Sequence, residues 1–350
     1  MPFAGKKQKG FGPENWGITL GQMKALTTRP GFTPDMTVRK LVETIVKPMT
    51  LACGTGLALR LNPGGLRTTK MVSHFWDENY LQFLASLQST GAGDTDAFWV
   101  CAFSIFQYDE AAMDKRGIRH NVGPTIGEQL GEDVNQGPFA AVIEQATDMY
   151  CVFTPGGFYH RDAKAGALGE GGTGKVNEYL SGNLYTRSWC VLEMLHAMEA
   201  GADKCRIHLC LSPLGKNLSE YLGLEKSFPS STVTLKDPNT GAVTALTERQ
   251  IKQLTLQAIL QPIDSRTSTC NGDDNAKIHS VLEQFGYDKI DKHVSDLRRE
   301  IVNERARAPR EDDPVDWAAV QMALARGDAK IRSFQGHVRS IIALNRMRDS

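Results

Sequence analysis

Short apolar runs and segments of helical spacing alternate through the middle of the chain. Four runs, KMVSHFW, FWVCAFSIF, DMYCVFTPG and CRIHLCLSP, lie between residues 70 and 213 and contain few charged side chains. Runs of this kind are typical of strands that a parallel sheet buries on both faces. Between them stand DENYLQFLASL, GPFAAVIEQA and RSWCVLEMLHAMEAG, in which apolar residues recur at helical spacing. This order predicts an α/β fold, a doubly wound parallel sheet with helices on both faces.

The flanking segments predict further helices and one irregular arm. Residues 1–36 are basic and rich in glycine, which predicts a loosely ordered arm, and residues 37–66 predict a helix from the N-cap Thr37 to Pro48 followed by a Gly-rich loop. After Pro213, the pattern predicts a hairpin around residues 239–241, a fifth strand at residues 258–263 and a helix at residues 277–302. We therefore expect an α/β domain at residues 67–305 and a helical tail at residues 306–350.

Composition excludes several classes of protein. The 350 residues are 41% hydrophobic and carry 40 basic and 40 acidic side chains, so no overall charge favours nucleic acid or an anionic membrane as a partner. No stretch reaches the roughly 18 apolar residues of a membrane span, and the N-terminus lacks the apolar core of a secretory signal. The seven cysteines stand mostly in apolar runs, as buried free thiols do in a reducing compartment. We expect a cytoplasmic protein without membrane or nucleic-acid partners.

Three of the apolar segments carry the residues of a family resemblance. The first strand ends in Ser73-His74, the third ends in Thr154-Pro155, and residues 188–194 read SWCVLEM. The last segment resembles the S-x-W-C-L-x-E-L signature of plant-type Toll/interleukin-1 receptor (TIR) domains, with one residue fewer before the tryptophan. Trp189 and Glu193 also have the W-x-x-x-E spacing of TIR enzymes that cleave NAD. The pattern is most similar to divergent TIR-like proteins of unicellular eukaryotes.

The resemblance implies a fold, an activity and a set of site residues. The implied fold is flavodoxin-like and TIR-like, with helical N- and C-terminal extensions and with long insertions at residues 107–137 and 158–185. The implied activity is cleavage of the nicotinamide-ribosyl bond of NAD+ in intracellular signalling, with NAD+ as substrate, no further cofactor and no metal. Self-association through TIR-like surfaces is implied as well. Glu193 takes the catalytic role, and the implied substrate-binding residues are Trp189, Ser73, His74, Phe75, Trp76 and His196.

The helical wheel of residues 188–200 places Glu193 outside the apolar face of the predicted helix. Apolar side chains form one broad face for packing on the sheet, while Glu193 shares the opposite edge with Trp189 and His196. Cleavage of an N-glycosidic bond passes through an oxocarbenium-like state, which a carboxylate stabilises, and an aromatic ring can stack on a base. Two alternatives stay open: a non-catalytic TIR-like scaffold module and a nucleoside deoxyribosyltransferase-like enzyme.

Other motifs give weaker signals. Residues 169–175, GEGGTGK, resemble a phosphate-binding loop, but Val176 stands where that motif needs Ser or Thr. Residues 53–56, CGTG, lack the third glycine of a dinucleotide-binding fingerprint. His208 and Cys210 alternate on one predicted strand, and two ligands do not make a zinc site. We interpret these three as loop, turn and core residues.

Overall fold

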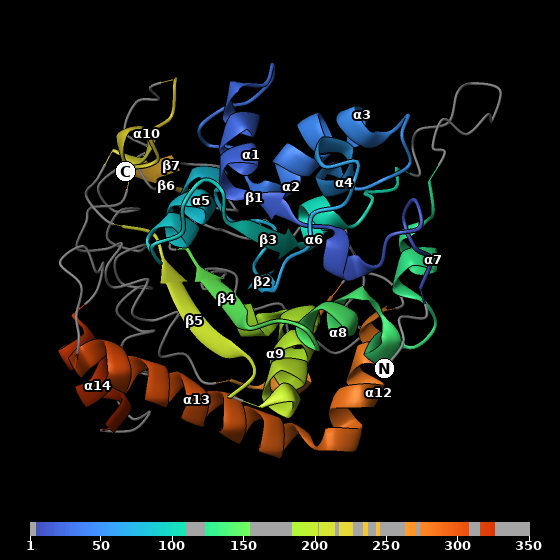
Figure 1. Ribbon diagram of the computed structural model, residues 1–350. Helices are drawn as coiled ribbons and strands as arrows, with labels where there is room; N and C mark the ends of the chain where they lie inside the picture. Colours follow the sequence, from blue (N-terminus) through green and yellow to red (C-terminus); the bar gives the residue numbers. More distant parts are fainter. Residues whose placement is uncertain are drawn as a thin grey trace.

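The computed structural model of the protein describes residues 5–109, 123–154, 184–201, 203–213, 217–226, 234–236, 243–245, 263–270, 274–307 and 316–325. Within them, five strands form one mixed sheet in the order β1-β3-β2-β4-β5 (Figure 1). Strands β2 (Lys70–Ser73), β3 (Ala97–Val100), β4 (Asp148–Phe153) and β5 (Arg206–Leu211) are parallel, and β1 (Ile18–Thr19) pairs antiparallel with β3. The chain is therefore an α/β protein with a mostly parallel sheet, and the four apolar runs are its parallel strands.

Helices cover both faces of the sheet (Figure 1). One face carries α8 (Pro138–Ile143), α9 (Ser188–Ala200) and α13 (Tyr287–Arg307), with α12 (Asp274–Phe285) packed against α9. The other face carries α1 (Leu20–Lys24), α2 (Val38–Leu41) and α5 (Tyr80–Gln88). The remaining described helices are α3 (Lys47–Thr50), α4 (Leu57–Leu61), α6 (Cys101–Ser104), α7 (Ile126–Leu130), α10 (Leu218–Tyr221) and α14 (Trp317–Ala325).

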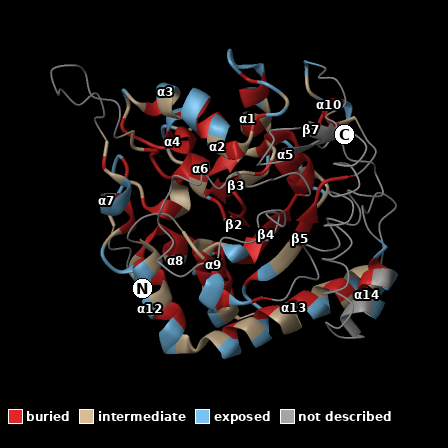
Figure 2. Cartoon of the chain, turned by 180° about the vertical axis from the view of Figure 1, so that it is seen from behind, coloured by how far each residue is buried: buried red, intermediate tan, exposed pale blue. Residues whose placement is uncertain are grey.

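The strands supply side chains to two separate hydrophobic cores. In β4, Met149 and Cys151 belong to the core under α8 and α9, whereas Tyr150 and Val152 belong to the core under α5. Alternate residues of a strand point to opposite faces, so a sheet covered twice needs apolar residues at every position. Figure 2 shows most of the sheet in red, except the start of β5, and exposed residues on the outer surfaces of α9, α12 and α13. The apolar runs of the sequence are continuous because both faces of the sheet are covered by helices.

Helices α5, α8 and α9 lie where their spacing predicts them, but β3 is shorter than its apolar run. The strand ends at Val100 and Cys101 begins α6. The Val100 amide donates to Ser104 Oγ at 3.0 Å, and Ser104 Oγ donates to the Trp16 carbonyl at 2.7 Å. These bonds end the strand at Val100 and lead the chain into α6. The prediction that the strand extends through the whole run FWVCAFSIF was therefore wrong.

Pro48 does not end the helix that begins after Thr37. The Thr37 hydroxyl accepts the Lys40 amide and caps α2 as predicted, and a π-helical turn at Val42–Val46 then leads into α3. Pro48 stands in the first turn of α3, where the missing amide of proline removes no necessary hydrogen bond. The wider π-turn before it makes room for the ring, and the helical path continues to Thr50.

Residues 5–36 are part of the core and do not form the loosely ordered arm that composition predicts. Trp16, Ile18, Leu20 and Met23 are each 0% exposed. Gln8 is buried as well, and it donates to the Ser104 carbonyl at 3.0 Å and accepts the Gly56 amide at 2.6 Å. Short 3₁₀ segments at Pro13–Asn15 and Ala25–Thr28 connect these elements. The segment thus adds β1 to the sheet and α1 to one covering layer.

A buried hydroxyl fastens α1 to α5. Tyr80 is 0% exposed, and its Oη donates to the Met23 carbonyl at 2.8 Å. We expect Tyr80→Phe to lower the free energy of unfolding by roughly 1–3 kcal/mol, because the carbonyl stays buried without this donor. Urea unfolding followed by far-ultraviolet circular dichroism would measure it. Equal midpoints for parent and variant would contradict the hydrogen bond.

The C-terminal half follows its predictions in part. Strands β6 (Thr234–Lys236) and β7 (Val243–Ala245) pair antiparallel as the predicted hairpin requires, but its turn lies outside the described residues. Residues 258–262 of the predicted fifth strand, the motif at residues 169–175 and most of the predicted tail lie outside them too. One helix was predicted at residues 277–302, but Gly286, at φ 87°, separates α12 from α13. Among the described helices, none is long and apolar enough to span a membrane.

Candidate functional site

The candidate site lies at the carboxyl ends of β2, β3 and β4. From β2 the chain crosses to β3 on one side and then back to β4 on the other, so the loops after β2 and β4 diverge. Open α/β sheets bind ligands at such a point, outside the carboxyl ends of the strands. Ser73 ends β2, Cys101 follows β3 and Thr154 follows β4. Polar side chains from three adjacent strands therefore share one edge of the sheet.

A buried imidazole–carboxylate pair occupies this edge. His74 Nδ1 lies 3.0 Å from Glu78 Oε1, and Thr154 Oγ1 donates to Glu78 Oε2 at 3.3 Å. Burial disfavours the imidazolium, but Cys101 and Glu78 outweigh it and raise the pKa of His74 to about 10. Burial also raises the pKa of the Glu78 carboxyl, and His74 partly offsets that rise. The pair holds a charged or proton-sharing group next to the sheet.

Glu193 lies at the same edge, on α9, and is only 4% exposed. The helical wheel predicted an edge away from the core, and this prediction was wrong because Glu193 lies against Ser73 and His74 at the end of β2, inside the fold. Burial raises the pKa of Glu193 to about 7, while Ser73 and His74 act in the opposite direction. Ser73 lowers the pKa of this carboxyl by its proximity. It forms no hydrogen bond with good geometry, since Ser73 Oγ and Glu193 Oε2 have no hydrogen-bond partner among the described residues.

Trp189 and His196 have other neighbours than the predicted wall beside Glu193. The Trp189 ring stacks on Phe139 of α8, with centroids 4.5 Å apart and planes at 27°. His196 Nδ1 lies 3.7 Å from a Glu199 carboxylate oxygen, and burial lowers the pKa of His196 to about 4. A largely buried neutral imidazole and a packed indole are what helix packing requires.

The two aromatic residues after β2 differ in exposure. Phe75 is buried, and the Arg187 guanidinium lies 5.9 Å from its ring centroid. Trp76 is partly exposed, and its indole Nε1 donates to Cys101 Sγ at 3.4 Å. Of the two, Trp76 therefore joins the group around His74 through Cys101, whereas Phe75 is buried beside Arg187.

Two residues of this edge escaped prediction. Glu78 lies four positions after His74 in the sequence, and the two side chains meet because the chain turns after β2. The spacing alone does not predict this contact. Cys101 stood inside an apolar run, and nothing in that run marks it as the residue that leaves the strand. Among the described residues, no group of three or more His, Cys, Asp or Glu side chains is arranged to hold a metal ion.

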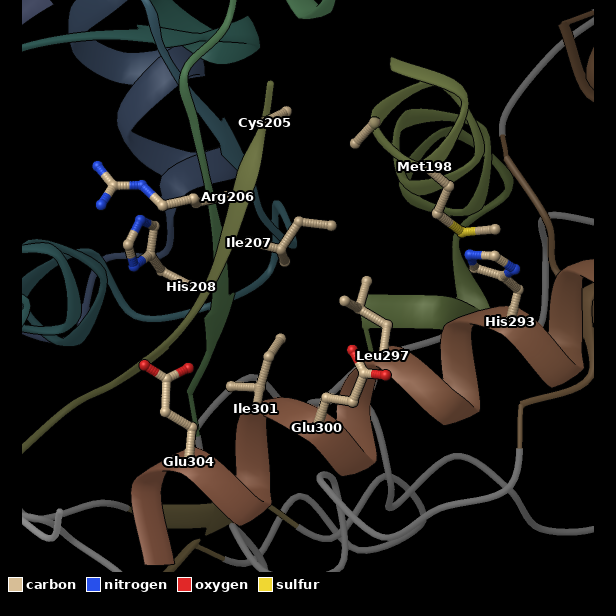
Figure 3. A pocket seen from close by; sticks show the side chains of 11 residues that line it. Met198, Cys205, Arg206, Ile207, His208, His293, Leu297, Glu300, Ile301 and Glu304 are labelled. Atoms are coloured by element: carbon tan, nitrogen blue, oxygen red, sulfur yellow. The ribbon is translucent and has the colours of Figure 1, made fainter. Parts of the chain in front are cut away.

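A cavity of about 320 Å³ lies elsewhere, between the end of α9, the start of β5 and α13 (Figure 3). Met198, Ile207 and Leu297 point into it, and Glu300 and Glu304 stand on α13 beside it (Figure 3). None of the predicted site residues lines this cavity. It borders the amino end of β5, whereas ligands of such sheets bind at the carboxyl ends of the strands, so we do not assign it the reaction.

Comparison with protein-family models, with curated proteins and with solved structures found no match.

The raised pKa of Glu193 predicts a pH-dependent difference between the parent and Glu193→Gln. The carboxyl has a pKa of about 7 in the folded state against an ordinary 4.5, so ionisation above neutrality costs folding free energy. Its contribution is fully present below pH 4.5 and is lost as the pH rises through 7. We expect the stability of the parent relative to the variant to fall by roughly 2–4 kcal/mol between those limits. Urea unfolding at both pH values would measure the difference, and a pH-independent one would contradict burial of the carboxyl.

Proposed function

We propose that this chain is a TIR-like NAD+ glycohydrolase that cleaves the nicotinamide-ribosyl bond in intracellular signalling. The observation that carries the proposal is the Glu193 carboxyl, buried beside Ser73 and His74 at the carboxyl ends of β2 and β4, with a pKa raised to about 7. A carboxylate in a water-poor site stabilises a developing positive charge more strongly than one in solvent. NAD+ is the substrate, and the reaction needs no metal.

The strand order supports a flavodoxin-like, TIR-like assignment of this sheet. Numbered along the chain, the four parallel strands stand in the order 2-1-3-4, which is the flavodoxin-like order up to its fifth strand. Within the proposed TIR-like domain at residues 67–305, helix α9 carries the W-x-x-x-E spacing. Strand β1 and the helices before residue 67 and after residue 305 are then the extensions of that domain.

Each site residue has a proposed role. Glu193 stabilises the oxocarbenium-like ribosyl group as the bond to nicotinamide breaks, and water completes the hydrolysis. The Ser73 hydroxyl and the His74 imidazole orient the ribose side of the substrate at the end of β2. Trp189 and Trp76 supply the aromatic surfaces for the bases, with Phe75 and His196 supporting them.

The burial of Glu193 makes access to it part of the proposal. At 4% exposure the carboxylate meets a substrate only after neighbouring side chains move, and association of two copies through TIR-like surfaces would supply that change. Activity per molecule should therefore rise with protein concentration. Equal specific activity from a monomer across a wide dilution series would contradict this dependence on self-association.

The stacking of Trp189 on Phe139 favours a second candidate, a non-catalytic TIR-like interaction module. In that case Trp189 and Glu193 serve packing alone, and the surfaces of the helices bind other TIR-like domains. The nucleoside deoxyribosyltransferase-like alternative uses the same carboxylate on nucleosides that lack the 2′-hydroxyl.

One experiment separates the three. The concentrated protein is incubated with NAD+ or with 2′-deoxyinosine plus adenine, and the products are resolved by liquid chromatography. Nicotinamide release supports the glycohydrolase, exchange of the base supports the transferase, and an inert protein at every concentration supports the interaction module.

A further inference from the structure

A thiol, an imidazole and a carboxylate lie in line at the carboxyl ends of the sheet. Cys101 Sγ, directly after β3, is 3.5 Å from His74 Nε2, directly after β2. The other ring nitrogen, His74 Nδ1, is 3.0 Å from Glu78 Oε1. Nucleophile, base and orienting acid have this order in enzymes that activate a side-chain nucleophile.

The surrounding bonds fix this arrangement. Glu78 is 1% exposed, and its second oxygen accepts the Thr154 hydroxyl at 3.3 Å. The Trp76 indole N–H donates to Cys101 Sγ at 3.4 Å, so the sulfur faces a donor as well as a base. Both ring nitrogens of His74 have a partner, which holds the imidazole plane between sulfur and carboxylate. The site is preorganised rather than formed by chance surface proximity.

Exposure separates Cys101 from most of the other thiols. Cys151, Cys190, Cys205 and Cys210 are buried, and burial raises the pKa of the Cys151 and Cys190 thiols. Cys101 is partly exposed and can meet a reagent. Cys53 is partly exposed too and has a lowered pKa, but its hydrogen bonds go to Thr50 and Thr55 and not to an imidazole. Cys53 therefore provides an internal comparison of a thiol without a base.

We propose that Cys101 is the nucleophile of an acyl-transfer site, with His74 as its base and Glu78 as the residue that positions His74, acting on activated esters or thioesters. Once His74 has lost its proton, the neutral ring takes the Sγ proton, sulfur bonds to the carbonyl carbon, the bond to the leaving oxygen or sulfur breaks, and His74 returns the proton to the leaving group. Water then cleaves the thioester and releases the carboxylic acid, which regenerates the thiol. This activity is separate from NAD+ cleavage and shares His74 with it.

The probe is p-nitrophenyl acetate, and nitrophenol release by the full-length protein is followed by absorbance. We expect Cys101→Ser to lower the rate at least tenfold, while the matched Cys53→Ser keeps the parent rate. Tryptic mapping of the unsubstituted protein after a short reaction should place the acetyl group on Cys101, a readout that needs no variant to fold. Acetyl groups found on Cys53 or on lysines and not on Cys101 would overturn the proposal.

The pH profile tests the role of Glu78. The His74 imidazole is faced by Cys101 from α6, by Glu78 from its own segment and by Glu193 from α9, while Cys190 of α9 donates to the His74 carbonyl. Glu78→Gln removes the charge that favours the imidazolium and therefore lowers the pKa of His74, so the rising limb of the acetylation rate should move to lower pH. A profile that keeps its midpoint and only loses amplitude would assign Glu78 to packing. The Glu193→Gln variant should still acetylate Cys101, which separates failure of this site from failure of the proposed NAD+ cleavage.

Discussion

Removal of residues 1–31 is expected to leave the remaining chain unfolded. The described part of this segment contributes β1 and α1, and it buries Trp16, Ile18, Leu20 and Met23 completely. Truncation of one large core side chain costs about 2–5 kcal/mol, and the whole stability of a domain is about 5–15 kcal/mol. Loss of four such side chains therefore exceeds what the fold can lose. Circular dichroism and thermal unfolding of the truncated protein would measure the outcome.

A point substitution keeps this test informative if the truncated chain cannot be purified. Trp16→Ala should lower the free energy of unfolding by about 3–5 kcal/mol, since the ring is 0% exposed and its Nε1 donates to the Phe11 carbonyl at 3.1 Å. Arg29→Ala, an exposed position in the same segment, should stay within about 0.5 kcal/mol of the parent. If the truncated protein unfolds cooperatively at the same midpoint temperature as the parent, the segment is a dispensable arm and this prediction is wrong.

The periodicity of apolar residues correctly predicted those strands and helices that pack against the same layers from end to end. Strand β4 lies between two helical layers, so each of its residues is apolar and the run is readable. Helix α5 is buried from Tyr80 to Leu87 and begins after the N-cap Asn79, whose side chain accepts the Gln82 amide. Where one environment persists over several residues, the pattern in the sequence reflects it directly.

The N-terminal segment lacks such persistence. Its buried residues pass from β1 into α1 and then into a 3₁₀ turn within about ten positions, so neither the strand period nor the helix period is maintained. The glycines and lysines around them then dominate the composition. The Trp16 carbonyl accepts a hydrogen bond from Ser104, which is distant along the chain, and the Ser104 carbonyl in turn accepts one from Gln8.

The sequence predicted three site residues that lie close together in the structure, but it did not predict what surrounds them. Ser73, His74 and Glu193 were predicted as site residues and the structure places them together, because strand ends that are adjacent in a sheet bring their loops together. The helical wheel placed Glu193 on the edge of α9 away from the sheet, whereas the residue is buried against Ser73 and His74. Cys101 joined His74 only because a hydroxyl, Ser104, ends β3 early.

Glu193→Gln is expected to lower the turnover of NAD+ by about 10²–10³-fold while leaving the Michaelis constant within a few-fold. The substitution preserves size and removes the charge that stabilises the oxocarbenium-like state, and removal of one such electrostatic contact costs about 2.7–4 kcal/mol. The parent turnover should rise with pH through about 7, because the ionised carboxylate is the active form and the pKa of Glu193 is about 7. Nicotinamide release measured between pH 5 and 9 would give both results.

The matched control for this substitution is Glu199→Gln, which changes the same functional group two turns further along α9. The Glu199 side chain is 45% exposed and lies beside His196, away from the Ser73 and His74 group, so its loss should leave turnover and the pH profile as in the parent. The two variants carry the same net charge, which removes long-range electrostatics as an explanation of any difference between them. If both variants cleave NAD+ at the parent rate, the carboxylate of Glu193 is not the catalytic group. If Glu193→Gln loses both its turnover and its cooperative unfolding transition, the loss of turnover is explained by unfolding. The pH-dependence of the parent then decides whether Glu193 is catalytic. A carboxylate that acts on the substrate must give the rate a pH-dependence that follows its own pKa.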